Sequence, residues 1–76
     1  MFTRRQVKSA QNKIASMKLK HKKTGSDVSI TLGNSTYVYH GDKSDPNTGE
    51  RYEQWTKDGD IVVTEGDILS AFLEEN

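Results

Sequence analysis

The sequence contains no cysteine and only one proline, Pro46. The absence of cysteine excludes disulfides, thiol nucleophiles and zinc–thiolate sites, so this chain of 76 residues must fold on its hydrophobic core. Its length suits one small domain, and we assign residues 1–76 to a single domain. We expect no metal or cofactor.

Long hydrophobic runs are also missing. No stretch approaches the roughly 18 consecutive apolar residues of a membrane span, and no apolar signal core follows the basic N-terminus. We therefore expect a cytoplasmic protein that does not bind membranes, in the host cytoplasm if the chain is viral. Asn34-Ser35-Thr36 matches a glycosylation acceptor, but we interpret it as a turn.

Acidic residues are absent from the first 24 positions. The net charge is zero, from 11 basic and 11 acidic residues, but residues 25–76 hold all 11 acids. The two parts therefore carry charges of +8 and −8. Such asymmetry is typical of a segment that binds nucleic acid or a membrane, and it allows charge-driven self-association between copies. The eight basic residues of the first part are Arg4, Arg5, Lys8, Lys13, Lys18, Lys20, Lys22 and Lys23.

A helix is predicted over about residues 3–22. Thr3 and Gln6 have the spacing of a capping box, and Gly25 can provide a left-handed C-terminal cap. Its apolar residues recur every three or four positions and form one narrow stripe, which leaves most of the circumference as a cationic surface. The stripe consists of Val7, Ala10, Ile14 and Met17, with His21 next in the same row.

After Asp27 the apolar period changes to two, which predicts a β-hairpin around Gly33-Asn34. Counting back from this turn pairs Leu32 with Ser35, Ile30 with Tyr37 and Val28 with Tyr39. All the large residues of one face then coincide, and a one-residue slip would scatter them.

Two further strands and a helix complete the pattern. Residues 45–49 have the chemistry of a turn that ends in a positive-φ glycine, Arg51 to Thr56 forms a third strand, and Asp58-Gly59 predicts a two-residue turn before a fourth strand at 61–63. A simple count places Trp55 opposite His40, whereas a bulge at Gly41 would bring it onto the face of Tyr39.

Thr64 then caps a last helix with an apolar face of Ile68, Leu69, Phe72 and Leu73. The predicted fold class is α+β, with an N-terminal helix, a four-stranded antiparallel meander and a C-terminal helix. We expect the sheet face that carries Val28, Ile30, Leu32, Tyr37 and Tyr39 to pack against both helices.

Three other groups of residues could have a functional role, but for each of them we prefer the interpretation without one. The aromatic side chains of Tyr37, Tyr39, Tyr52 and Trp55 could stack on single-stranded nucleic acid, but they are needed for the core. Asp42, Asp45, Asn47 and Glu50 could chelate calcium weakly, but such residues are typical of turns. His21 and His40 have no acidic residue or serine at a spacing that would indicate a catalytic site. We therefore expect that the protein is not an enzyme.

The sequence thus favours a small, non-enzymatic binding protein of a regulatory or accessory kind that places its cationic helix on nucleic acid. Gln11 and Asn12 add amides that can read bases. The alternative is a protein-interaction module, such as a small phage- or host-encoded inhibitor that docks on a protein partner. The predicted contact residues are Arg4, Arg5, Lys8, Gln11, Asn12, Lys18, Lys20, Lys22 and Lys23.

Overall fold

The computed structural model describes residues 2–75 and confirms the predicted α+β order of a helix, four strands and a helix. The four strands form one antiparallel sheet in the order β1-β2-β3-β4, a simple meander. The elements are α1 (Arg4–Thr24), β1 (Val28–Leu32), β2 (Ser35–Ser44), β3 (Arg51–Lys57), β4 (Ile61–Val63) and α2 (Glu65–Glu75). Helix α1 is two residues longer at its C-terminal end than predicted.

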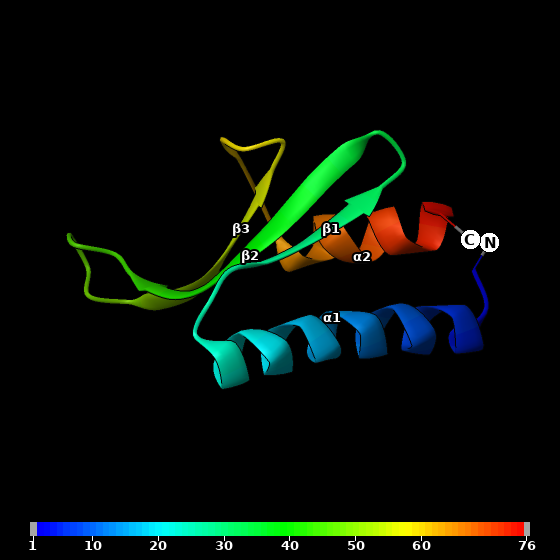
Figure 1. Ribbon diagram of the computed structural model, residues 1–76, viewed down its shortest axis with the longest axis horizontal. Helices are drawn as coiled ribbons and strands as arrows, with labels where there is room; N and C mark the ends of the chain where they lie inside the picture. Colours follow the sequence, from blue (N-terminus) through cyan, green and yellow to red (C-terminus); the bar gives the residue numbers. More distant parts are fainter. Residues whose placement is uncertain (1, 76) are drawn as a thin grey trace.

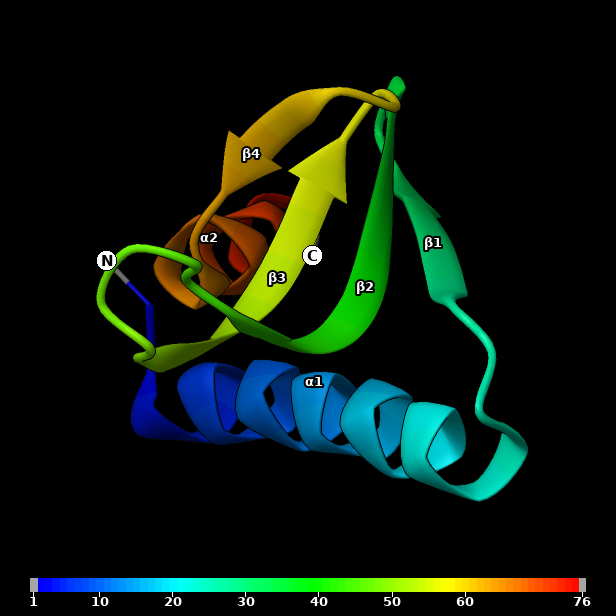
Figure 2. The same cartoon turned by 90° about the vertical axis from the view of Figure 1, so that its left-hand side faces the viewer.

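The two helices lie on the same side of a curved sheet. They run antiparallel, with the C-terminal end of α2 near the N-terminal end of α1 (Figure 1). The strands curve around α2, and α1 lies beside it along the lower side of the molecule (Figure 2). The β2–β3 hairpin projects beyond the helices, so the molecule measures 39 × 24 × 23 Å (Figure 1).

The first hairpin has the predicted register. Leu32 pairs with Ser35, Ile30 with Tyr37 and Val28 with Tyr39, around the turn at Gly33-Asn34. The predicted inward face is confirmed, with the difference that Ile30 is only half-buried. Alternation of apolar side chains and a two-residue turn point to the same pairing, which is why this register could be counted from the sequence.

A β-bulge at Gly41 determines the position of Trp55. The β2–β3 register shifts between Tyr39 and Gly41, and Tyr39 pairs with Trp55. The simple count, which placed Trp55 opposite His40, was therefore wrong, and the alternative with a bulge is confirmed. Gly41 has a φ of +85°, which favours glycine. Trp55 is 1% exposed, with its ring centroid 4.7 Å from that of Tyr39.

The turn between β3 and β4 is one residue longer than predicted. Lys57 pairs with Ile61, which leaves the three residues 58–60 as the loop. Asp58, the first residue of this loop, extends the contacts of β3 with β2: its N–H donates to the carbonyl of Thr36 at 2.8 Å, and its Oδ1 accepts from the N–H of Thr36 at 3.0 Å. Strand β3 therefore ends at Lys57 rather than at the predicted Thr56.

Helix α2 begins with a reciprocal cap. The N–H of Asp67 donates to the Thr64 hydroxyl at 3.2 Å, and the N–H of Thr64 donates to the Asp67 carboxylate at 2.9 Å, which satisfies amide groups that the first turn leaves unpaired.

The hydrophobic core joins both helices to the inner face of the sheet. Its buried residues are Ala10, Ile14, Met17, Val28, Leu32, Tyr37, Tyr39, Trp55, Ile68, Phe72 and Leu73.

Candidate nucleic-acid interface

The cationic helix α1 has well-defined ends. The N–H of Gln6 donates to the Thr3 hydroxyl at 3.2 Å, and the N–H of Thr3 donates to the Gln6 side chain at 2.8 Å, which confirms the predicted capping box. At the other end Gly25 adopts a left-handed conformation and its N–H donates to the His21 carbonyl at 2.8 Å. The 21 residues between these caps extend for about 31 Å at about 1.5 Å per residue.

Helix α1 buries only a narrow stripe. Ala10, Ile14 and Met17 are its buried residues, and they face α2 and the sheet. Among the described elements, none lies on the opposite side of α1 (Figures 1 and 2). The solvent-facing side is therefore accessible along the whole helix, as the thin apolar stripe predicts.

Most of the predicted contact residues lie on this accessible side. Their side chains are exposed, and within residues 2–75 none of these basic groups forms an ion pair with a carboxylate. Lys22 lines a shallow cavity together with Asp42 and Glu53, so part of its positive field is offset. The exposed contact residues are Arg4, Arg5, Lys8, Gln11, Asn12, Lys20, Lys22 and Lys23.

Lys18 has a different environment. Its Nζ lies 2.6 Å from Oε2 of Glu53 in β3 and also pairs with Glu65 at the start of α2. Partial burial lowers the pKa of Lys18, but the hydrogen bonds and charges of Glu53 and Glu65 more than offset this effect, so its pKa lies above the ordinary 10.5. Lys18 thus connects α1 to the sheet and to α2.

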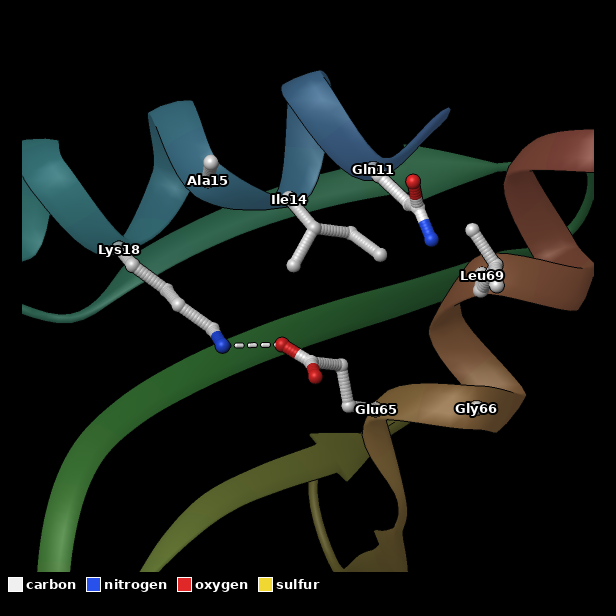
Figure 3. Close-up of a pocket in the computed structure, with 7 residues that line it drawn as sticks. All are labelled: Gln11, Ile14, Ala15, Lys18, Glu65, Gly66 and Leu69. Carbon is white, nitrogen blue, oxygen red and sulfur yellow. Dashed lines mark ion pairs between the residues drawn. The ribbon is translucent and has the colours of Figure 1, made fainter. Parts of the chain in front are cut away.

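Gln11 lies in a groove between the two helices. The groove has a volume of about 240 Å³, and its floor consists of Ile14, Ala15 and Leu69. In Figure 3 the Gln11 amide points toward Leu69, and the Lys18–Glu65 pair lies at the other end of the groove. Gln11 is exposed, but it lies on the side of α1 next to α2, whereas Asn12 lies on the side away from the groove.

Lys13 is also directed toward the body of the protein. Its Nζ lies 5.7 Å from the centroid of the Phe72 ring, within the range of a cation–π interaction. Both basic residues in the middle of α1 are consequently engaged by side chains of other elements. The remaining cations of α1 are exposed and lie toward its two ends.

The aromatic residues do not form a stacking surface. Tyr37, Tyr39 and Trp55 are buried, so their predicted role in the core is confirmed. Tyr52 is 47% exposed on the projecting hairpin. Burial raises the pKa of Tyr39 above its ordinary 10.0, and the charge of Glu53 adds to this effect.

The acidic loop uses its polar groups for the turn. Asp45 Oδ1 accepts the N–H of Asn47 at 2.8 Å, and the Asp45 carbonyl accepts the N–H of Gly49 at 2.8 Å. Gly49 has the predicted positive φ, at +75°. Within residues 2–75, no three acidic, histidine or cysteine side chains are grouped closely enough to hold a metal ion.

Sequence reasoning missed a network around His40. The His40 Nδ1 lies 2.9 Å from Asp27 Oδ2, and its Nε2 lies 2.8 Å from the Thr56 hydroxyl. An acid, an imidazole and a hydroxyl in this order also occur in nucleophilic catalysis. Thr56 is only 7% exposed, however, so a substrate would have little access to its hydroxyl. The contacts connect β2 to β3 and to the residue before β1, and His40 lies where the register between β2 and β3 shifts, between Tyr39 and Gly41.

Comparison with known proteins adds no relative: neither a family model, nor a curated protein, nor a solved structure matches this chain. Within the described part of the chain, no helix combines the length and the apolar character that crossing a bilayer requires.

Proposed function

We propose that this protein is a small nucleic-acid-binding protein, non-enzymatic and regulatory or accessory in kind, that contacts phosphates through the solvent-facing side of α1. The observation that carries the proposal is the set of exposed cations on α1, which have no carboxylate partner within residues 2–75. The acids of the chain lie on other elements. Phosphate contacts of this type give affinity with little sequence selectivity.

The charge distribution at the start of α1 supports this proposal. Arg4 and Arg5 occupy the first turn, where no acidic residue is present. A cation there costs about 0.3–1 kcal/mol, because it opposes the positive end of the helix dipole. Helix α2, by contrast, has the acidic residues Glu65 and Asp67 in its first turn, where a negative charge interacts favourably with the helix dipole. A bound phosphate would form ion pairs with Arg4 and Arg5 and so compensate their unfavourable interaction with the helix dipole.

The test is binding of fluorescently labelled DNA and RNA of mixed sequence at about 50 mM and about 200 mM salt. We expect binding at the lower salt that weakens steeply at the higher salt. A variant with Arg4→Gln, Arg5→Gln and Lys8→Gln should bind several-fold more weakly, since glutamine keeps helix propensity but removes charge. Absence of binding at the lower salt to every nucleic acid tested would contradict the proposal.

The matched control removes the same charge outside α1. The chain has three basic residues after position 24, so Lys43→Gln, Arg51→Gln and Lys57→Gln give a variant of equal net charge. We expect this control to retain binding. The oligomeric state of the labelled protein alone is measured at both salts. This measurement separates nucleic-acid binding from self-association between the basic and acidic parts of two copies.

A protein partner is the second candidate function, and the groove between α1 and α2 favours it. Its apolar floor of Ile14, Ala15 and Leu69 would suit an apolar side chain of a short acidic segment, with the cations of α1 beside it. Leu69→Lys should abolish such docking and leave phosphate contacts intact. Loss of nucleic-acid binding in Leu69→Lys, with the fold preserved, would contradict the separation of the two surfaces.

A further inference from the structure

Apart from Lys13, whose ammonium group lies over the Phe72 ring, the exposed cations of α1 form two groups, one toward each end of the helix. The first group is Arg4, Arg5 and Lys8, and the second is Lys20, Lys22 and Lys23. We call them the N-terminal and the C-terminal cluster. Their centres are 16 positions apart, which corresponds to about 24 Å at about 1.5 Å of rise per residue.

Between the clusters, both cations of α1 contact side chains of other elements. Lys13 lies over the Phe72 ring, and Lys18 is paired with Glu53 and Glu65. The solvent side of this middle section carries Asn12, Ser16 and Leu19 instead, all exposed and uncharged.

One cation of each cluster lies on the same line of the helix as the uncharged middle, and the other cations lie to either side of it. Arg5, Asn12, Ser16 and Lys23 are separated by seven, four and seven positions, and at 3.6 residues per turn such spacings keep side chains on the same side. One ligand lying against this line would meet charge, then polar groups, then charge again.

We infer that α1 binds double-stranded DNA and lies over its major groove, with the N-terminal cluster on the phosphates of one strand and the C-terminal cluster on those of the other. This inference rests on the proposed function and specifies its ligand. The major groove of B-form DNA is about 12 Å wide and admits an α-helix. A separation of about 24 Å between clusters spans the groove together with the phosphate rows that border it.

The uncharged middle fits the same placement. Asn12 would face the base edges in the groove, where an asparagine amide can form two hydrogen bonds with adenine. The short Ser16 side chain allows close approach, and Leu19 offers an apolar contact for a thymine methyl group. A cation between the clusters would have no phosphate to meet there.

Single strands fit this surface less well. Proteins that bind them combine a continuous positively charged track with aromatic side chains on which bases stack. Helix α1 has a gap of 12 positions between Lys8 and Lys20, and Arg4–Thr24 contains no aromatic side chain except that of His21, which packs on Tyr39 with ring centroids 5.2 Å apart. Double-stranded RNA is also less suited, because its major groove is deep and narrow.

The experiment measures affinity against salt for a DNA duplex of about 20 base pairs, which at about 3.4 Å per step is longer than α1. The same sequence is tested as single-stranded DNA and as an RNA duplex. With six phosphate contacts, the slope of log K against log salt on duplex DNA should be about −5. On a single strand, where one cluster engages, it should be about −2, with weaker binding at every salt.

Two charge-matched variants test the bridge between strands. Arg4→Gln with Arg5→Gln and Lys8→Gln removes the N-terminal cluster, and the corresponding three changes at 20, 22 and 23 remove the C-terminal cluster. Each should reduce the slope on duplex DNA by about 2.7, that is, by about half, and the two effects should be similar. Melting curves must show that both variants are fully folded at the temperature of the binding assay, which restricts the effect to contacts.

The outcomes are distinguishable from those for the proposed function. Single-stranded DNA or duplex RNA bound as tightly as duplex DNA would overturn the groove placement and leave phosphate binding by α1 intact. A slope that depends on one cluster only would overturn the bridge between two strands. Absence of binding to all three nucleic acids would overturn both the inference and the proposed function.

Discussion

Lys18 Nζ lies 2.6 Å from Oε2 of Glu53, and this contact joins the centre of α1 to the third strand of the sheet. The same ammonium group also pairs with Glu65, the first residue of α2. One side chain thereby connects three elements that are far apart in the sequence. Without it, two carboxylates would face each other with no positive charge between them.

We predict that Lys18→Met lowers the free energy of unfolding, because it removes both ion pairs. The loss should be only about 1 kcal/mol, because both carboxylates are partly exposed and solvent screens the pairs. Urea denaturation measures the change. Lys20→Met is the control, since Lys20 is exposed and forms no ion pair within residues 2–75, and its effect should stay within about 0.5 kcal/mol. Equal effects of the two substitutions would show that the Lys18 pairs contribute nothing to stability.

Stability should fall as the pH rises above about 10. The pKa of Lys18 is raised in the folded protein, so its contribution is complete below the unfolded value of 10.5 and is lost as the pH rises through the folded value. Tyr39 acts in the same direction: its raised pKa keeps the buried phenol neutral, while the unfolded chain ionises above 10.0. Urea denaturation at about pH 9 and about pH 11 measures the loss.

A double variant isolates these two groups from the other titrating residues. Lys18→Met with Tyr39→Phe removes both ionisations, and we expect it to lose less stability over this pH range than the native protein. If the double variant and the native protein lost the same amount, then other groups would be responsible for the alkaline sensitivity.

Local patterns determined which parts of the fold could be predicted. The register of Val28 with Tyr39 followed from alternation and a short turn, and the cap at Thr3 followed from spacing to Gln6. The end of β3 was misplaced because Asp58 bonds to Thr36, 22 positions earlier in the chain. That hydrogen bond depends on how two strands meet, which no local pattern contains.

The same distinction applies to the candidate site. Exposure of Arg5 and Lys23 follows from the thin apolar stripe of α1, because they lie on its opposite side. The ion pairs of Lys18 could not be predicted, since Glu53 and Glu65 approach it only when the sheet and α2 are in place. Grouping of the exposed cations into two clusters is therefore a property of the tertiary structure.

The indole of Trp55 should contribute more to stability than any half-buried apolar side chain of the sheet. Trp55 is 1% exposed, so Trp55→Ala should cost about 3–5 kcal/mol, which a domain of this size survives poorly. Ile30 is only half-buried, and Ile30→Ala should cost less. Urea denaturation of the two alanine variants gives the order, with failure of Trp55→Ala to fold counting as the larger loss, and a larger loss in Ile30→Ala would place the centre of the core elsewhere.

Gly41 is required for two separate reasons, and both can be measured. Its φ of +85° disfavours other residues, and a Cβ at this position would lie 2.5 Å from Cε1 of His21. We expect Gly41→Ala to cost about 2–4 kcal/mol, from about 1–2 kcal/mol of backbone strain and a further overpacking cost. Gly49→Ala is the matched control, because Gly49 also has a positive φ, +75°, with no atom within 4 Å of the added Cβ.

The overpacking part of this cost should disappear when His21 is shortened. In a His21→Ala background, Gly41→Ala should cost no more than Gly49→Ala, because only the backbone strain remains. The four proteins of this cycle give the coupling between Gly41 and His21 directly from urea denaturation. A Gly41→Ala cost that is the same with and without the imidazole would mean that the bulge is maintained by its backbone conformation alone, with no contribution from the packing of α1 against β2.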